Sequence, residues 1–300
     1  MTQQTNVVAQ QQKQVHPVVA FKNFLATPNV TKDVAKRLGS ASKDFCNSLI
    51  ELVTDTQSIQ TFTPSDILQC AYKAAALHLP LNKQLGRAYI VPFKNKGVTK
   101  PTFIIGYKGL VQLAKNSGQY KTINTGVVYE GQLKNINYLS GDIDISGTPV
   151  SRKVEGFFAH VVEVTGFTKT FFMTAQEMAH YAKTYSPSLK FTKEVTEETL
   201  LTKFNLHSER GPEVGVGWLA DSITMAKKVV LKQLLDKWGS LSIEVQAAIA
   251  ADESTESSPE MERNNESEDE KQEFTAYQEV DKETGEIQTQ ETFPGDETAD

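Results

Sequence analysis

The order of apolar patterns along the chain predicts an α+β fold with a mostly antiparallel sheet. The first apolar pattern along the chain has helical spacing. A pair of short alternating runs, one helix and several more strand-like runs follow, and helical spacing returns near the end. Strands that follow one another closely in sequence are typical of antiparallel hairpins. The sequence contains no internal repeat of the solenoid type.

The first folded segments are expected to be helical. Apolar positions recur at helical spacing over residues 30–53, and Gly39 is expected to divide this stretch into two helices. Thr63 is the expected N-cap of the next helix, because its hydroxyl can accept a hydrogen bond from the first turn, and Pro64 suits the first helical position. This helix should end before Pro80, which cannot continue it.

The segment most informative about function is a hairpin predicted at residues 88–105, together with the helix that follows. Its connecting loop, residues 94–100, contains three lysines. The helix is expected to bury one apolar stripe and to expose Lys108 and Lys115 on another face. A strand-to-helix turn presents free backbone N–H groups, and nearby lysines would favour an anion there. This arrangement is typical of a track for a polyanion.

The second half of the chain is expected to hold further strands and then helices. The expected strands are residues 120–129, 136–145, 155–164 and 171–173, and the expected helices are 174–185, 218–238 and 243–251. Residues 186–215 show no periodicity and are expected to form a long irregular excursion. Such stretches are uncommon in compact domains unless they serve as binding loops, hinges or subunit contacts.

Net charge divides the chain into two unlike parts. Residues 251–300 contain 18 acidic and 3 basic side chains, so their charge is 3 − 18 = −15. The whole chain carries −6, so residues 1–250 carry −6 + 15 = +9. We therefore expect a disordered or loosely ordered N-terminal arm at residues 1–28, a basic core at 29–252 and a disordered acidic tail at 253–300.

Composition disfavours several classes of protein. No apolar run approaches the roughly 18 residues of a membrane span, and the glutamine-rich N-terminus lacks the apolar region of a signal peptide. Cys46 and Cys70 lie in helical patterns among apolar neighbours, so we expect buried thiols in a reducing cytosol and neither a disulfide nor a metal site. These features predict a cytoplasmic protein that does not contact a membrane.

Catalytic motifs are weak in this sequence. It contains no Walker-type phosphate loop, no His-Glu-x-x-His and no Cys/His zinc spacing, so we expect neither a cofactor nor enzymatic activity. Gly215 and Gly217 imitate part of a dinucleotide motif without its preceding strand. Asp142 and Asp144 could hold a metal ion. The simpler interpretation is that both are solvent-exposed carboxylates at the edge of a strand.

Basic and aromatic side chains in the core predict contacts with a nucleic acid, because rings stack on bases while cations hold phosphates. Lys228 and Lys232 are expected on a polar face of the 218–238 helix, away from its apolar stripe. Tyr107 also fits its own helix's apolar stripe, so a core role is the simpler interpretation, and Tyr89 is a second candidate ring. The candidate DNA-binding residues are Arg87, Lys94, Lys96, Lys100, Tyr107, Lys108, Lys115, Lys121, Arg210, Lys227, Lys228 and Lys232.

Five blocks of the sequence, in the same order, resemble the RecT family of phage and prophage recombinases, which anneal complementary DNA strands without ATP. The blocks are residues 77–81, 88–93, 103–114, 172–186 and 218–235. The chain departs from the family pattern at Lys227 and Lys228, where the family has Lys-Thr. This departure leaves open which of the two lysines faces DNA.

The resemblance implies a core similar to that of the lambda beta annealing protein, with a small sheet packed against a long helix and flanking helices. It implies an ATP-independent protein that binds single-stranded DNA and a nascent duplex, and that assembles with its own copies into a ring or helical filament. Implied partners in the bacterial cytoplasm are a RecE-type 5′→3′ exonuclease and the host single-strand binding protein.

Two alternative functions come from other classes. A metal-dependent nuclease would use Asp142, Asp144 and a further carboxylate such as Glu155, and it would degrade labelled DNA when magnesium is present. A passive scaffold would coat single-stranded DNA without accelerating duplex formation. Loss of a DNA end label would identify the nuclease, and an annealing assay separates the passive scaffold from an annealing protein.

Overall fold

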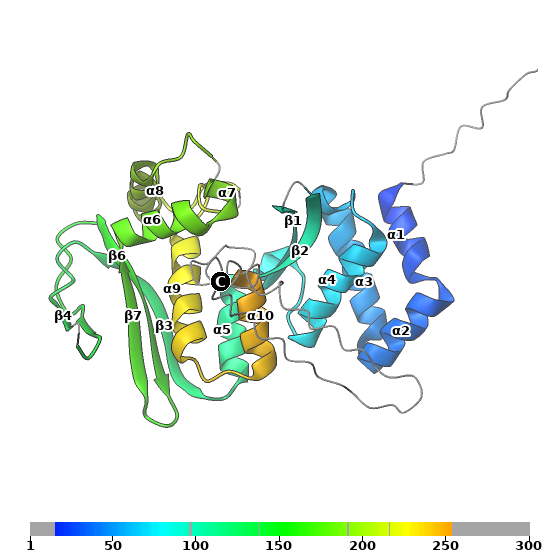
Figure 1. The fold of residues 1–300 in the computed structure, drawn as a ribbon, viewed down its shortest axis with the longest axis horizontal. Helices are drawn as coiled ribbons and strands as arrows, with labels where there is room; N and C mark the ends of the chain where they lie inside the picture. The colour runs from blue at the N-terminus through cyan, green and yellow to red at the C-terminus, as the bar shows by residue number, and fades with distance from the viewer. Residues whose placement is uncertain (1–15, 96–97, 138, 191, 216, 254–300) are drawn as a thin grey trace, which may run out of the picture. The chain divides into compact units, whose positions relative to one another are not determined.

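Four helices form the N-terminal part of the fold (Figure 1). The computed structural model describes residues 16–95, 98–137, 139–190, 192–215 and 217–253. The apolar sides of these helices join one core cluster with the strands that follow. The helices are α1 (Pro17–Leu25), α2 (Pro28–Leu38), α3 (Ser42–Asp55) and α4 (Pro64–Ala76), and the short 3₁₀ turns η1 (Gly39–Ala41) and η2 (Gln57–Ile59) flank α3.

The prediction of a disordered or loosely ordered arm at residues 1–28 is wrong for residues 17–28, which are ordered and include helix α1. Val18, Phe21 and Leu25 are buried in the core. Burying each apolar side chain contributes about 1.5–3 kcal/mol, which offsets the entropy lost on ordering a short helix. Residues 1–15 of the predicted arm and 254–300 of the predicted tail lie outside the described residues.

The helix boundaries expected from local chemistry are confirmed. Gly39 follows α2 with a φ of 55°, a left-handed conformation that glycine adopts without strain, and it separates α2 from α3. The Thr63 hydroxyl accepts a hydrogen bond from the backbone N–H of Asp66 at 3.2 Å, with Pro64 at the first helical position of α4.

The predicted hairpin and helix are present as β1 (Ala88–Asn95), β2 (Val98–Ile105) and α5 (Tyr107–Asn116), after the 3₁₀ turn η3 (Lys83–Leu85). The strands pair without a register break from Ala88 opposite Ile105 to Asn95 opposite Val98. The connection is therefore much shorter than the predicted loop at 94–100, since Lys94 and Lys100 belong to the strands.

A three-stranded antiparallel sheet forms the second part of the fold, in the order β3 (Tyr120–Tyr129), β6 (Val154–Glu163) and β7 (Thr168–Thr174). The single strand predicted at residues 136–145 is instead a pair of short strands, β4 (Asn135–Asn137) and β5 (Asp142–Asp144). Gly141, with a φ of 74°, lies in the turn between them, and it allows the chain to reverse there.

The long helix α9 (Ser222–Trp238) packs against this sheet on one side and against α5 on another (Figure 1). A small antiparallel sheet against a long helix, with flanking helices, confirms the predicted fold class. The helix begins at Ser222, four residues later than the predicted start at 218. Leu219, which falls within the predicted helix, therefore precedes the observed one and is exposed.

The prediction of an irregular segment at residues 186–215 is also wrong, because most of this segment is helical. Thr196 and Thr199 form a reciprocal cap at the start of helix α8 (Glu197–Arg210). Leu200 and Phe204 are buried residues of this helix. The apolar positions in this segment are few and interrupted by polar ones, so periodicity alone did not reveal the helix. The remaining helices are α6 (Ala175–Tyr185), α7 (Pro187–Lys190), α8 (Glu197–Arg210) and α10 (Ile243–Glu253).

A capping box begins α6 and supports a stability prediction. The Thr174 hydroxyl accepts from the N–H of Glu177 at 3.1 Å, and the Glu177 carboxylate accepts from the N–H of Thr174 at 2.8 Å. We expect Thr174→Ala to lower the free energy of unfolding by about 1 kcal/mol, and thus the midpoint of thermal unfolding by about 2–4 °C. Thr202→Ala in the middle of α8 is the control and should change the midpoint little, so equal effects would contradict the prediction.

Two further findings concern the cysteines and the apolar character of the helices. Cys46 and Cys70 are free thiols, and burial raises the pKa of both. The Cys70 thiol donates to the carbonyl of Pro101 at 3.1 Å. Across the described residues, we found no helix with the length and apolar character needed to cross a membrane.

Candidate nucleic-acid interface

The first turn of α5 lies directly against the start of β1. The N–H of Gly106 donates to the carbonyl oxygen of Arg87 at 2.8 Å. A Cβ added to Gly109 would lie only 2.0 Å from that same oxygen, so the strand backbone occupies the space that any other residue would fill. Glycines in the Gly-Tyr-Lys-Gly turn thus bring Arg87 and Lys108 to the same helix N-terminus.

This helix N-terminus has the features of an anion site. Gly106 is the N-cap and provides no side chain to cap the first turn of α5. The first N–H groups of a helix lack intrahelical acceptors, and the helix dipole favours negative charge there. Lys108 is exposed beside these groups and Arg87 is half-buried. A phosphate oxygen would therefore meet both backbone donors and cations.

Lys108 and Tyr89 converge above Gly86, which has a φ of 64°. A Cβ at Gly86 would lie 3.3 Å from the Tyr89 hydroxyl and 3.5 Å from Cδ of Lys108. The ring of Tyr89 also covers Gly106, where an added Cβ would lie 2.9 Å from its Cε2. The Tyr89 side chain and the methylene stem of Lys108 therefore lie on the same glycine at the junction of β1 and α5.

One side of the β1–β2 hairpin continues from this junction toward the tip. Opposed residues on paired strands point to the same face, so the register assigns each side chain. Ala88, Ile90, Phe103 and Ile105 are buried on one face. The other face, which we call the hairpin face, is half-buried to exposed, and it consists of Tyr89, Val91, Phe93, Lys100, Thr102 and Ile104.

The hairpin face alternates rings and cations along its length. Phe93 is directly opposite Lys100 near the tip, and Tyr89 lies beside Lys108 at the base. Four residues of strand separate the two rings by about 13 Å. Rings next to cations suit a single strand, because bases stack on rings while ammonium groups hold phosphates. Phe93 is not among the predicted site residues, although the alternation of Tyr89, Val91 and Phe93 was a signal for it.

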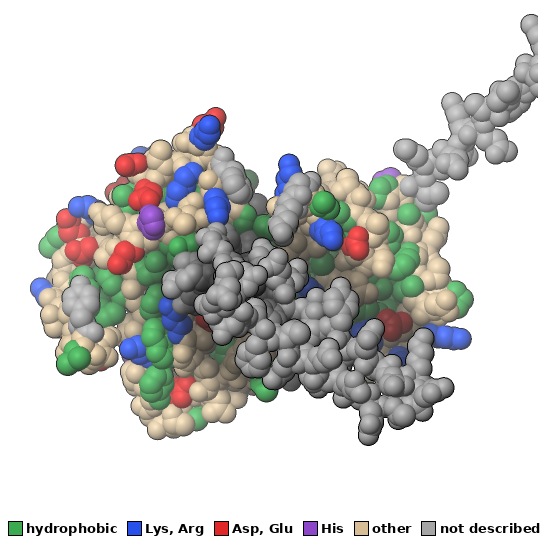
Figure 2. All heavy atoms as spheres, in the orientation of Figure 1, with side chains coloured by type: hydrophobic (Ala, Val, Ile, Leu, Met, Phe, Trp, Pro, Cys, Tyr) green, Lys and Arg blue, Asp and Glu red, His purple; other side chains and the backbone are tan. Residues whose placement is uncertain are grey.

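The other lysines of the hairpin do not share this face. Lys94 is opposite Thr99, on the side of the hairpin where Ile90 is buried, and its own side chain is exposed. Lys96 lies outside the described residues. Figure 2 shows basic side chains beside the tip of the hairpin, whereas acidic side chains gather over α6 and α8.

Lys115 and Lys121 extend the basic surface beyond α5. Both side chains are exposed. Lys115 follows Lys108 by seven residues, about 10 Å along the helix, on the side away from buried Leu110 and Ala114. Lys121 lies at the start of β3, just after the turn that ends α5.

The predicted surface position of Lys228 and Lys232 is wrong. They are 5% and 1% exposed, so both lie within the core. Helix α9 is covered by the sheet, by α5 and by α8, so its polar-looking face is buried as well as its apolar stripe. Lys227 is half-buried on the same helix. Arg210 is exposed in the last turn of α8, an element separate from the hairpin face.

Two aromatic residues have structural positions, and for Tyr107 this confirms the simpler interpretation of its role. Tyr107 is half-buried against the core, and its hydroxyl shares a 2.6 Å hydrogen bond with Thr125 of β3. Trp218 is buried and packs near Phe204. Neither ring belongs to the hairpin face.

The acidic residues considered for a nuclease are engaged locally. Asp142 accepts from Ser140 at 2.6 Å, and a hydrogen bond from Ser146 lowers the pKa of Asp144. Glu155 belongs to a different strand, β6. Across the described ranges, we found no group of three His, Cys, Asp or Glu side chains placed to hold a metal ion.

Comparison with known proteins identifies the family of this chain. The RecT family model matches residues 43–273. The uncharacterized protein YqaK of Bacillus subtilis (strain 168) is 34% identical over 253 residues, which cover 84% of this chain and 77% of that protein. Protein RecT of Escherichia coli (strain K12) is 28% identical over 200 residues, covering 63% of this chain and 61% of that protein. The chain therefore belongs to the RecT family, and this membership supports a role as a single-strand annealing protein in DNA recombination.

Proposed function

We propose that this chain anneals complementary DNA strands without nucleotide hydrolysis, and that the hairpin face and the N-terminus of α5 hold the single strand. The observation that carries the proposal is the convergence of Arg87, Tyr89 and Lys108 at one helix N-terminus. From there the hairpin face continues to Phe93 and Lys100. Phosphates would contact the cations and the backbone N–H groups, while bases would stack on the two rings.

In this proposal, the free energy of DNA binding drives annealing. Neutralising phosphates releases counterions and lowers the repulsion between two approaching strands. Contacts to the backbone and ring faces leave base edges free, so pairing selects the complementary strand and the protein need not read sequence. Lys115 and Lys121 would extend the track, and Lys94, Lys96, Arg210 and Lys227 are further proposed phosphate contacts.

In this proposal the protein acts as a homo-oligomer, because the hairpin face of one copy spans only a few nucleotides. Copies arranged in a ring or helical filament would align their tracks into a longer annealing surface. The bound forms would be single-stranded DNA and the nascent duplex. A 5′→3′ exonuclease that exposes single strands and the host single-strand binding protein are the proposed partners.

The test of this function is an annealing assay with complementary labelled oligonucleotides and no nucleotide present. For Arg87→Ala/Lys108→Ala we expect binding to single-stranded DNA to weaken about 10- to 30-fold near 0.1 M salt, because the slope of log K against log salt falls by about 1.4 when two phosphate contacts are lost. Lys36→Ala/Lys43→Ala, which removes two exposed lysines of α2 and α3, is the matched control.

Three outcomes would contradict the proposal in different ways. Absence of annealing by the unaltered protein at low salt would remove the function. Binding without faster duplex formation would identify a passive coating protein. Unaltered annealing by the Arg87/Lys108 variant would leave the function and remove the assigned site.

A further inference from the structure

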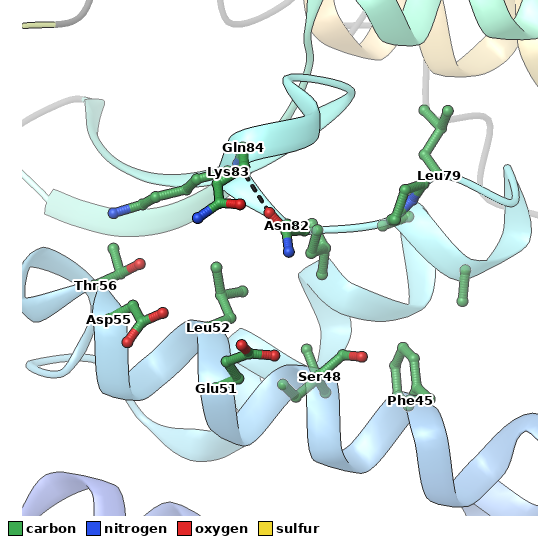
Figure 3. Close-up of a pocket in the computed structure, with 15 residues that line it drawn as sticks. Phe45, Ser48, Glu51, Leu52, Asp55, Thr56, Leu79, Asn82, Lys83 and Gln84 are labelled. Atoms are coloured by element: carbon green, nitrogen blue, oxygen red, sulfur yellow. Dashed lines mark hydrogen bonds between the residues drawn. The ribbon is translucent and has the colours of Figure 1, made fainter.

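A cavity of about 360 Å³ lies between α3, the end of α4 and residues 79–84 (Figure 3). This volume falls within the usual range of about 300–1,000 Å³ for small-molecule sites. The cavity shares no residue with the hairpin face, although residues 79–84 precede Gly86 and Arg87 closely in sequence. Its apolar lining consists mainly of buried leucines, which are Leu49, Leu52, Leu79 and Leu81.

Two carboxylates stand at the edge of this apolar lining. Glu51 and Asp55 are four residues apart on α3, a spacing that places both on one face of a helix. Both are exposed lining residues, and in Figure 3 they project from α3 toward the space beneath residues 82–84. Lys83 lines the opposite edge, so the two carboxylates outnumber it.

A buried hydroxyl group in the same lining has no partner in the protein. Thr56, which follows α3, is 5% exposed, and its Oγ1 has no hydrogen-bond partner among the described residues. Figure 3 shows the Thr56 hydroxyl directed toward the cavity. Buried polar groups are normally hydrogen-bonded, so an unpaired one at a cavity wall points to a ligand that supplies the missing bond.

We propose that this cavity binds a primary alkylammonium ion on an unbranched aliphatic chain, that is, the protonated form of a linear alkylamine. An ammonium group carries three donors and no acceptor, which matches two carboxylates and a hydroxyl oxygen. The methylene chain would lie against the leucines, as the stems of lysine side chains do on apolar surfaces. An anion would meet the carboxylates unfavourably, and an apolar ligand would leave the Thr56 hydroxyl unpaired.

The experiment is calorimetric titration of the full-length protein, without DNA, with linear primary alkylamines of three to six carbons. We expect each additional buried methylene to strengthen binding about three- to fourfold, until the chain exceeds the cavity. Glu51→Gln/Asp55→Asn should weaken binding at least tenfold. The acidic tail is unchanged in this variant, so nonspecific binding of cations to the tail cancels in the comparison. Glu209→Gln/Asp236→Asn, which neutralises two exposed acids elsewhere, is the matched control.

Two further variants should change the affinity for the ligand in opposite directions. Thr56→Val removes the unpaired hydroxyl, so it should raise the unfolding midpoint of the free protein while weakening alkylamine binding. Lys83→Met removes a like charge at the edge and should strengthen alkylamine binding.

Three results would overturn the proposal. Affinity that does not depend on chain length would exclude the leucine contacts, and equal weakening by the control pair would show nonspecific charge binding. If the protein forms the proposed homo-oligomer, its dissociation by Glu51→Gln/Asp55→Asn, without alkylamine, would show that a side chain of another copy occupies the cavity.

Discussion

Replacing both rings of the hairpin face, Tyr89→Leu/Phe93→Leu, is expected to reduce the affinity for single-stranded DNA at least about 30-fold, because each stacked base contributes about 1–3 kcal/mol. Leucine keeps most of the apolar volume, so the hairpin should still pack against the core. The salt dependence of binding should not change, since no phosphate contact is lost. The measurement is the dissociation constant for a labelled oligonucleotide at several salt concentrations.

This salt signature separates the rings from the cations. Removing Arg87 and Lys108 should lower the slope of log K against log salt, whereas removing the rings should lower log K by the same amount at every salt concentration. Phe167→Leu, at an exposed phenylalanine in the turn between β6 and β7, is the control and should bind like the unaltered protein. An unchanged affinity of the Tyr89/Phe93 variant would show that bases do not stack on this face.

Gly109→Ala is expected to destabilise the protein strongly, although alanine favours an isolated helix over glycine by about 1 kcal/mol. The added Cβ would lie 2.0 Å from the carbonyl oxygen of Arg87, so either β1 or α5 must move. We expect the free energy of unfolding to fall by about 3 kcal/mol, which corresponds to a thermal midpoint about 6–12 °C lower. Annealing measured well below that midpoint should also fall, because Arg87 and Lys108 separate.

Gly118→Ala is the control for the Gly109 variant. Gly118 has a φ of 68° but open space around its Cβ position, so alanine there should cost only the about 1–2 kcal/mol of a left-handed residue. Annealing by this control should be unchanged at a temperature where it is folded. A Gly109 variant as stable as the unaltered protein would mean that the close approach of β1 and α5 is not maintained in solution.

Elements stabilised by local chemistry could be predicted from the sequence. The cap of α4 at Thr63, the division at Gly39 and the alternation that forms β1 and β2 depend on neighbours within a few residues. The charge division between a basic core and an acidic C-terminal segment follows from counting side chains. The family blocks are linear patterns too, and the match over residues 43–273 confirms the resemblance.

The sequence by itself therefore determined the family, the fold class and the presence of a basic hairpin followed by a helix. Only the tertiary structure decided which side chains meet. Periodicity reports one buried face of a helix, so it could not show that α9 is covered on several sides and that Lys228 and Lys232 lie in the core. Likewise, strand register placed Lys100 with the rings and Lys94 on the other side. Packing between elements distant in sequence sets these positions, and a linear pattern carries no information about it.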